Sequence, residues 1–339
     1  MHRRVSAIML GYGTEEHLEH ALAALVSSVG DAGEVVLVDN GVVDGARRRA
    51  AWPEQVVVVE PGENTGFSGG CHVGVDASSG DTLVFVNSDA VVEPAAVREL
   101  VAALDEPGVA IAGGCLLLAD APGRVNSVGN PLHYSGITWA GSMGEPVEDH
   151  AVGTDVAVAT GGLFALHRAQ WDALGGFDPM YFAYNEDTDL CVRTWLSGGR
   201  VVYVPAARAV HHYEFSRSAL KMHLVERNRL VTVLTDYPPH LLAAVLPALL
   251  VVEPLLLVQA VLQGWWRQKL SSWTWVLRHR RVLLERRRRV QAAVTDPHAL
   301  DARLVTRIEP PMVAAPPGMS LVNGGLALYW RLARPVTRG

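Results

Sequence analysis

Residues 81–89, DTLVFVNSD, set the pattern from which the fold of this chain is predicted. An apolar run rich in β-branched residues leads directly into polar side chains, as in a buried strand that ends at a turn. Similar runs that end in polar or turn residues occur earlier in the chain, in VSAIML (5–10), EVVLVDN (34–40) and QVVVVEP (55–61). We therefore expect these four segments to be strands of one sheet.

The segments between these strands have helical patterns. TEEHLEHALAALVSS (14–28) repeats apolar residues at helical spacing with Thr14 as the expected cap, and PAAVRELVAAL (94–104) begins with Pro94 at a first helical position. Strands that alternate with helices are typical of a parallel sheet with helices on its faces. We predict an α/β fold, in which ligands bind beyond the carboxyl ends of the strands.

Polar residues gather at these strand ends. Asp39 and Asn40 end the second strand, and Asn87 and Asp89 end the fourth. An acid placed directly after an apolar strand is unfavourable unless it meets a cation or solvent. Mg²⁺ or Mn²⁺ bridging a diphosphate would satisfy Asp89, and a turn-capping role is the equal alternative.

Two histidines, His211 and His212, follow another apolar strand, RVVYVP (200–205). Adjacent residues of an extended segment point to opposite sides, so at most one of the two histidines would face the same site.

A glycine-rich loop lies in ENTGFSGGCHVGVDASSGD (63–81). Gly66, Gly69 and Gly70 would let the backbone approach a ligand closely, and the helix that follows would offer free N–H groups to phosphate oxygens. The loop matches neither the GxGxxG fingerprint of dinucleotide-binding proteins nor the GxxxxGK(S/T) phosphate-binding loop.

Three acids are gathered in MYFAYNEDTDLCVR (180–193): Glu186, Asp187 and Asp189. One interpretation is helix chemistry, in which Asn185 caps the helix and the acids favour the positive end of its dipole. The other is that one of the carboxylates also takes part in a reaction.

Composition excludes several classes of protein. A chain of 339 residues that is 49% hydrophobic can bury a large core, which excludes a disordered protein. Its three cysteines form no CxxC pair, so neither a disulfide framework nor a thiolate zinc site is indicated, and a reducing setting fits. We interpret the N-terminal MHRRVSAIMLGYG as a first strand, not as a signal peptide.

The character of the sequence changes near residue 216. Residues 240–266 are apolar but contain Pro247, Glu253 and Pro254, so we expect two helices broken near the prolines in place of one spanning helix. Tryptophans follow, and residues 264–291 then hold nine basic residues, including Arg286–Arg289, against one acid, in a chain of net charge -6. This combination predicts peripheral attachment to an anionic membrane surface. Nucleic-acid binding is not expected, since the basic stretch lacks interleaved aromatic residues.

Taken in order, six motifs resemble the inverting sugar transferases of glycosyltransferase family 2, in particular bacterial rhamnosyltransferase-type members that act on lipid-linked acceptors. The motifs are DNG (39–41), NTGFSGG (64–70), NSD (87–89), GGLFALHR (161–168), GGFDPMYFAYNEDTDLCVR (175–193) and HHYEFS (211–216). The resemblance implies a GT-A catalytic domain over residues 1–215, with a mostly parallel sheet. Residues 216–339 would form a helical, membrane-associating region.

The resemblance also implies roles for residues on the donor side. Asp39 would accept the imide N–H of a uracil or thymine base of a UDP- or dTDP-sugar. The nucleotide and donor would be contacted by Asn64, Gly66, Phe67 and Asn87. Asp89 and His211 would bind Mg²⁺ or Mn²⁺.

On the acceptor side the resemblance implies that Asp187 is the general base. Glu186 and Asp189 would orient neighbours or bind acceptor hydroxyls. The start of a helix is expected to hold Asp187 ionised and to lower its basicity.

Three positions depart from the family pattern. Val42 follows DNG where the family usually has serine, and Cys71 and His72 stand near positions that commonly hold asparagine. These changes are expected to touch the donor pocket. NSD also has one aspartate where a full DxD motif has two.

The expected function is transfer of a sugar, such as rhamnose, onto a lipid-linked or cell-envelope glycan at the cytoplasmic face of the membrane. A nucleotidyltransferase is one alternative, but it would lack a motif for a triphosphate. A sugar-nucleotide-binding protein without transferase activity is another, against which the acids at 39, 89 and 187 argue.

Overall fold

The computed structural model describes residues 4–212, 218–311 and 318–334, so residues 213–216 of the HHYEFS motif lie outside the described part. The chain divides into two compact units. The sheet unit comprises residues 1–130, 140–194 and 199–214, and the helical unit comprises residues 131–139, 195–198 and 215–339.

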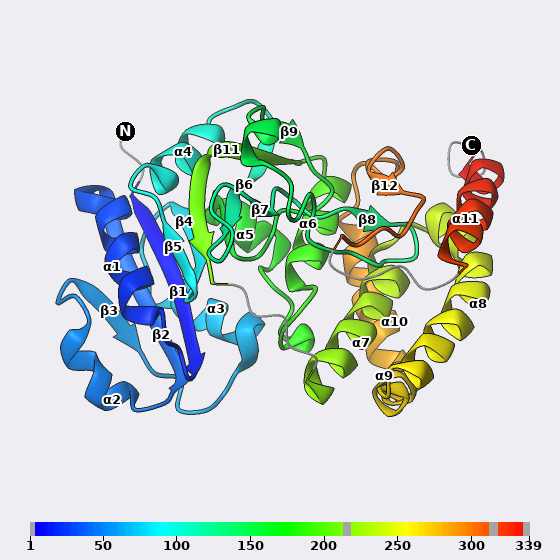
Figure 1. Ribbon diagram of the computed structural model, residues 1–339, viewed down its shortest axis with the longest axis horizontal. Helices are drawn as coiled ribbons and strands as arrows, with labels where there is room; N and C mark the ends of the chain where they lie inside the picture. Colours follow the sequence, from blue (N-terminus) through cyan, green and yellow to red (C-terminus); the bar gives the residue numbers. More distant parts are fainter. Residues whose placement is uncertain (1–3, 213–217, 312–317, 335–339) are drawn as a thin grey trace. The chain divides into compact units, whose positions relative to one another are not determined.

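The sheet unit is built on a ten-stranded sheet, whose main path runs in the order β3-β2-β1-β4-β10-β6-β11-β5 (Figure 1). β7 pairs with β6 and β9 with β11. The strands are β1 Val5–Gly13, β2 Gly33–Val42, β3 Val56–Val59, β4 Thr82–Asn87, β5 Ala90–Val92, β6 Val109–Leu118, β7 Val125–Ser127, β9 Thr154–Asp155, β10 Leu163–His167 and β11 Arg200–His211.

The four strands predicted from the sequence form one parallel block, because β1 pairs in parallel with β2 and β4, and β2 with β3. β10 runs antiparallel between β4 and β6, and β6 and β11 are again parallel. The predicted α/β fold is confirmed, with antiparallel strands inserted beyond β4.

Helices cover both faces of the sheet. Ala7 and Met9 of β1 share a core cluster with Leu22 of α1, whereas Ile8 faces Gly74 of α3, as expected for alternating strand residues. The helices of this unit are α1 Leu18–Val29, α2 Gly45–Arg48, α3 Gly66–Asp76, α4 Ala96–Ala103, α5 Arg168–Leu174 and α6 Glu186–Leu196. Short 3₁₀ turns are η1 Gly30–Ala32, η2 Arg49–Ala51, η3 Val147–His150 and η4 Pro179–Tyr181.

Two helix starts differ from the prediction. α1 begins at Leu18 after His17, so Thr14 does not cap it, and α4 begins at Ala96, so Pro94 precedes the helix. The cause at α1 is that β1 continues to Gly13 and Glu15 accepts a hydrogen bond from the backbone N–H of Tyr12 at 3.1 Å.

The glycines of the 63–81 segment serve close packing within the protein. At Gly70 an added Cβ would lie 2.0 Å from Leu10 of β1. Gly66 has φ +70, and its Cβ would lie 2.4 Å from the carbonyl oxygen of Phe182. Glycine at these positions therefore lets α3 approach β1 and the 182 loop, rather than leaving space at a ligand.

The helical unit contains five α-helices and a two-stranded sheet in its described residues, and β8 pairs in parallel with β12 (Figure 1). The elements are β8 Leu132–His133, α7 Ala219–Asp236, α8 Pro239–Leu262, α9 Trp266–Arg278, α10 Arg280–Ala292, β12 Leu304–Val305 and α11 Met319–Ala333.

The expected break near the prolines is wrong, because α8 is one helix of 24 residues with Pro247 and Pro254 inside it. Burial of one side of the helix, at Leu241, Val245 and Leu249, outweighs the backbone hydrogen bonds that the prolines remove. α8 is long and apolar enough to cross a membrane by length and composition, and a third of its most apolar window is buried.

Glu253, the acid inside α8, belongs to a buried ionic cluster. Its carboxylate accepts hydrogen bonds from Lys269 at 2.8 Å, from Trp273 Nε1 at 2.6 Å and from Arg229, and both cations also contact Glu226. Burial opposes ionisation, but the two cations outweigh it and lower the pKa of Glu253 to about 2. The charged carboxylate of Glu253 therefore links α8 to α7 through Arg229 and to α9 through Lys269.

The basic stretch is not one exposed stripe, which corrects the expectation for Arg286–Arg289. Arg286 is 2% exposed and pairs with Asp236, Lys269 lies in the cluster above, and Arg287 is half-buried against backbone carbonyls of 234 and 237. A buried cation needs an acidic partner, and α7 supplies one to Arg286. The exposed basic residues of 264–291 are Arg267, Arg278, Arg280, Arg281, Arg288 and Arg289.

Candidate active site

Strand register brings the predicted polar residues to one edge of the sheet. Gly11 of β1 lies opposite Asp39 of β2, and Leu10 lies opposite Asn87 of β4. The carboxyl ends of these parallel strands therefore meet at the same edge, where α/β proteins bind ligands.

A cavity of about 280 Å³ lies at this edge. Asp39 accepts hydrogen bonds from the backbone N–H groups of Gly41 and Val42 through Oδ1, at 3.2 and 2.8 Å. Its Oδ2 lies where a Cβ on Gly45 would be only 2.4 Å away, so glycine at 45 leaves room for the carboxylate. The cavity is lined by Tyr12, Asp39, Asn40, Gly41, Glu60, Gly62, Glu63 and Asn64.

Asn40 joins the second strand to the glycine-rich loop. Its side-chain amide donates to Asn64 Oδ1 at 3.0 Å, and its Oδ1 accepts from the backbone of Thr65 at 3.0 Å. Asn64 Oδ1 also accepts from the backbone N–H of Gly66 at 2.9 Å. Asn64 is thereby held at the cavity, whereas Phe67 packs against Phe177 with ring centroids 5.9 Å apart.

Asp89 and His211 are brought together by strand pairing, because Ala90 of β5 lies opposite His211 of β11. His211 Nε2 is 3.1 Å from Asp89 Oδ1, and its Nδ1 is 2.8 Å from Asn126 Oδ1. The ring of His212 stacks instead on His17, with centroids 3.5 Å apart. Only one of the two adjacent histidines therefore faces Asp89.

This pair has the chemistry of a divalent metal site. The Asp89 side chain is 35% exposed and His211 is 8% exposed, so an anionic oxygen and a fixed imidazole nitrogen meet at the surface. In the tautomer whose Nδ1–H donates to Asn126 Oδ1, the lone pair of Nε2 is available to an ion. The residues fit Mg²⁺ or Mn²⁺, whose remaining ligands would be oxygens.

Glu15 and Asn126 belong to this region but were missed from the sequence. Burial raises the pKa of Glu15, and the nearby charge of Asp89 raises it further. Glu15 was assigned to a helix, although its position directly after the first strand was a usable signal. Asn126 lies on β7, a strand of three residues without a recognisable pattern.

The acid-rich helix α6 meets the same edge through the 161–162 loop. The backbone N–H of Asn87 donates to the carbonyl of Gly162 at 3.1 Å, and that of Gly161 donates to Asp187 Oδ2 at 3.0 Å. Thr188 N–H donates to Asp187 Oδ1 at 2.7 Å. Asp187 is thus held one loop away from the end of β4.

The backbone before α6 is strained. Phe182, Tyr184 and Asn185 have φ of 62°, 69° and 64°, in the left-handed region that residues with a side chain rarely adopt. Such residues cost about 1–3 kcal/mol each and cluster at functional sites.

Glu186 and Asp187 are adjacent carboxyl groups whose charges affect each other. Burial raises the pKa of Glu186 to about 8, and the charge of Asp187 adds to the shift. Burial also raises the pKa of Asp187, against hydrogen bonds from Gly161 and Thr188 that lower it. The expectation that the helix start lowers the basicity of Asp187 is therefore wrong, because burial is the larger effect.

We expect Glu186→Gln to make the protein more stable at alkaline pH. In the folded state the pKa of Glu186 is raised to about 8 from 4.5, so wild-type stability falls as pH rises from 4.5 to 8. Glutamine has no such loss, and the advantage of the variant should grow across this window. Urea unfolding at pH 5 and pH 8 measures it, with exposed Glu148→Gln as the control. An equal difference at both pH values would contradict the shift.

Asp189 is placed differently from its neighbours. Asp189 is fully buried and accepts a hydrogen bond from the hydroxyl of Tyr181 at 3.2 Å. Its Oδ2 accepts hydrogen bonds from two guanidinium nitrogens of Arg193. Arg193 also donates to the carbonyl oxygens of Leu174 and Gly176. The expected acceptor-side position of Asp189 does not agree with this geometry. The buried guanidinium of Arg193 needs an anionic partner, and the carboxylate of Asp189 supplies it within α6.

The three departures from the family pattern face the protein interior. Val42 is 8% exposed and in the core, and Cys71 is 2% exposed in α3. His72 Nε2 lies 2.6 Å from the carbonyl oxygen of Phe177, and its ring packs on Trp171. These side chains therefore do not line the cavity beside Asp39.

The sequence is similar to those of known glycosyltransferases. WbbL, a rhamnosyltransferase of Escherichia coli K12, is 37% identical over 84 residues, which are 23% of this chain and 32% of WbbL. N-acetylglucosaminyl-diphospho-decaprenol L-rhamnosyltransferase of Mycobacterium tuberculosis is 25% identical over 232 residues, 60% of this chain and 75% of that protein. Some relatives are much longer, and the chain spans only 12% of O-antigen biosynthesis protein RfbC of Myxococcus xanthus.

The solved structure of GalNAc-T7 with UDP, GalNAc and Mn²⁺ has a TM-score of 0.55 to this chain at 16% identity, covering 71% of this chain and 50% of GalNAc-T7. At this identity the likeness concerns the fold, and it confirms the expected GT-A architecture. The model of the family described as "Glycosyltransferase like family 2" matches residues 3–232, more than half of the chain. The chain therefore belongs to this glycosyltransferase family.

Proposed function

We propose that this glycosyltransferase moves a deoxyhexose such as rhamnose from a UDP- or dTDP-sugar to a hydroxyl of a lipid-linked or other cell-envelope glycan, with inversion. The observation that carries the proposal is the placement of Asp187, one loop from the strand end that holds Asn87 and Asp89. Two relatives named rhamnosyltransferases support the sugar, and the decaprenol-linked name of one supports the lipid-linked acceptor.

The nucleoside would bind in the cavity beside Asp39. One carboxylate oxygen of Asp39 is engaged by backbone N–H groups, and the second can accept the imide N–H of uracil or thymine. Asn64 lines the same cavity and would contact the sugar of the nucleoside. Gly66, Phe67 and Asn87 would position the loop and strand end around the donor rather than bind it through long side chains.

Asp89 and His211 would hold Mg²⁺ or Mn²⁺, with Asn126 fixing the orientation of the histidine ring. When bound, such an ion offsets the negative charge that develops on a leaving diphosphate. GalNAc-T7, which shares the fold, was solved with Mn²⁺.

Asp187 would accept the proton of the attacking acceptor hydroxyl. Its raised pKa makes the carboxylate a stronger base than an exposed aspartate, and its partial exposure leaves it accessible. Glu186, with a pKa of about 8, would be protonated at neutral pH and could donate a hydrogen bond on the acceptor side.

A panel of nucleotide sugars, incubated with the full chain, Mn²⁺ and a polyprenyl-diphosphate-sugar acceptor, tests the proposal. We expect release of UDP or dTDP that depends on the acceptor, and a product of inverted anomeric configuration by NMR. Release of sugar 1-phosphate, with transfer of the nucleoside monophosphate, in place of release of the nucleoside diphosphate would contradict it and indicate a nucleotidyltransferase.

The helical unit would attach this enzyme peripherally to the cytoplasmic face of the membrane. Its described helices expose large apolar side chains as well as arginines. These provide hydrophobic burial and electrostatic attraction, the two contributions that bind a protein at a membrane interface. More than half of each of the following side chains is exposed: Leu250, Leu262, Leu277, Leu284, Leu321 and Leu332.

We expect replacement of Arg280, Arg281, Arg288 and Arg289 by glutamine to weaken binding to vesicles with acidic lipids at least about tenfold, since each arginine contributes about 1 kcal/mol near an anionic surface. All four are exposed, so folding should be unaffected. Cosedimentation at low and high salt measures the effect.

The charge-matched control replaces four exposed arginines of the sheet unit, Arg47, Arg49, Arg98 and Arg124. Equal loss in the control would show a general charge effect. Pelleting that resists salt and is reversed only by detergent would show that α8 inserts, against the peripheral model.

A further inference from the structure

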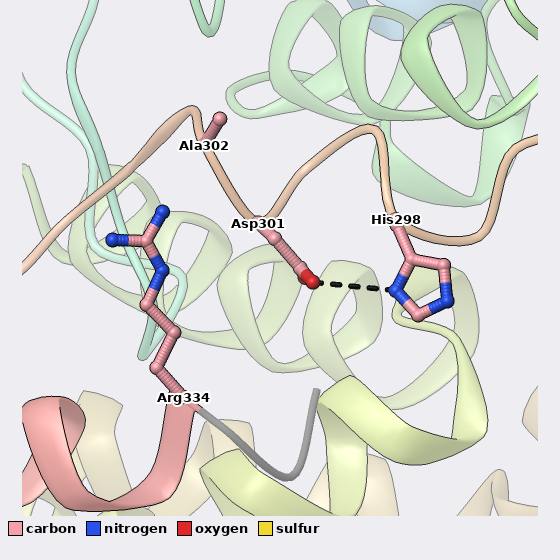
Figure 2. Close-up of a pocket in the computed structure, with 4 residues that line it drawn as sticks. All are labelled: His298, Asp301, Ala302 and Arg334. Carbon is pink, nitrogen blue, oxygen red and sulfur yellow. Dashed lines mark hydrogen bonds and ion pairs between the residues drawn. The ribbon is translucent and has the colours of Figure 1, made fainter. Parts of the chain in front are cut away.

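Three side chains of types that can ligate a metal lie together in the helical unit, outside the candidate active site. His240 lies in the first turn of α8, and His298 and Asp301 lie between α10 and β12. Each offers one ligand atom, and these atoms are all within 4.8 Å of one another. Figure 2 shows the carboxylate of Asp301 directed at the ring of His298, whose Nδ1 is 3.3 Å from Asp301 Oδ2. The rings of His240 and His298 are 4.6 Å apart.

Two polar atoms of this cluster are buried without a partner. Neither Nε2 of His240 nor Oδ1 of Asp301 has a hydrogen bond within the described residues. The Asp301 residue is 7% exposed, so water satisfies it poorly. An unsatisfied buried group costs about 1–3 kcal/mol, and two in one cluster therefore need a physical explanation. A cation bound between them would satisfy both.

We propose that His240, His298 and Asp301 bind a Zn²⁺ ion. Two imidazole nitrogens and one carboxylate oxygen form a ligand set typical of zinc, at bond lengths of about 2.0–2.2 Å. Two ligands of a tetrahedral ion at such lengths are about 3.3–3.6 Å apart. The distance of 3.3 Å between His298 Nδ1 and Asp301 Oδ2 meets this requirement. The ligand atoms of all three residues lie within 4.8 Å of one another, and rotation of the half-exposed His298 side chain can shorten the separations that remain too long.

The surroundings leave one ligand position open. A cavity of about 270 Å³ adjoins the cluster and is lined by His298, Asp301, Ala302 and Arg334 (Figure 2). Three protein ligands with an open fourth position are the pattern of zinc sites that hold water or an anion. The guanidinium of Arg334 at the same cavity favours an anionic fourth ligand, such as hydroxide or phosphate. A bound ion would join the segment around 298–301 to the start of α8.

Zinc titration of the full chain tests the proposal. The protein is stripped with a chelator and carries Asp89→Ala, which removes a ligand of the catalytic metal from the measurement. Competition with a chromophoric chelator should show one equivalent of Zn²⁺, and Co²⁺ should give the visible spectrum of a tetrahedral site. Zn²⁺ should also raise the Tm, because it binds only the folded state.

Asp301→Asn and His240→Gln should each weaken zinc binding at least about tenfold and remove the rise in Tm. His279→Gln, a histidine of the same unit whose Nδ1 contacts the carbonyl of Trp275, should change neither and is the matched control. His298→Gln tests the same site at a half-exposed side chain if the buried variants fail to fold. Absence of a zinc equivalent, or binding that survives these substitutions, would overturn the proposal.

Discussion

Asp187→Asn should reduce turnover by about 10²-fold or more, the usual effect of losing a general base. Asparagine is nearly isosteric with aspartate, and its side-chain oxygen can still accept from Gly161 or Thr188, so the fold and donor affinity should change little. What is lost is the carboxylate that takes the proton of the acceptor hydroxyl. Steady-state kinetics with saturating acceptor and calorimetric binding of the nucleotide separate the two effects.

Two variants of the same unit serve as controls. Asp76→Asn changes an exposed acid at the end of α3 and should leave turnover unchanged. Asp189→Asn should lower the free energy of unfolding by about 3–5 kcal/mol, since it leaves Arg193 without its carboxylate partner. Wild-type turnover in folded Asp187→Asn would remove Asp187 from the role of base.

Chelation of divalent metal should abolish activity, and Asp89→Ala should reduce it by about 10²-fold or more. Several kcal/mol of charge stabilisation depend on the ion that Asp89 would hold, and about 1.4 kcal/mol corresponds to a factor of ten. His211→Gln should have a smaller effect. His212→Gln should have none, because its ring stacks on His17 and does not face Asp89.

Binding of Mn²⁺, followed by electron paramagnetic resonance in the presence of UDP, gives a readout that does not depend on turnover. It should weaken in Asp89→Ala and His211→Gln and persist in His212→Gln. Full activity in EDTA would show a cation-free mechanism. A stronger effect at His212 than at His211 would show that the wrong side of β11 was assigned to the metal.

The parallel block of the sheet could be predicted because its strands are local patterns. In β1, β2 and β4, apolar runs end in polar or turn residues, and these short β-branched runs are enough to identify the strands. Helix starts were less predictable, because Thr14 is a good cap by type but the continuing strand β1 occupies the chain up to Gly13. The continuity of α8 depends on neighbouring helices, which override the prolines.

The positions of site residues were predictable where these residues lie at the ends of strands. Asp39 lies near the end of β2, Asn87 ends β4 and Asp89 comes two residues later. Alternation of extended residues separates His211, the last residue of β11, from His212. The partners Asn126 and Gly161 reach the site only through pairing of segments far apart in sequence, which leaves no local signal. The raised pKa of Asp187 was missed because it depends on burial, whereas the sequence indicated only a helix start.

The path of the chain through the helical unit limits how the protein can be divided for expression. Residues 131–139 lie in the middle of the sequence but belong to the helical unit, where β8 pairs with β12 and Tyr134 stacks on Trp330. A fragment that ends at residue 215 would lack both partners and expose Leu132 and Tyr134, which are fully buried in the whole chain. A single cut therefore cannot release the catalytic part as a clean recombinant domain, and a soluble version would need this nine-residue excursion redesigned as well.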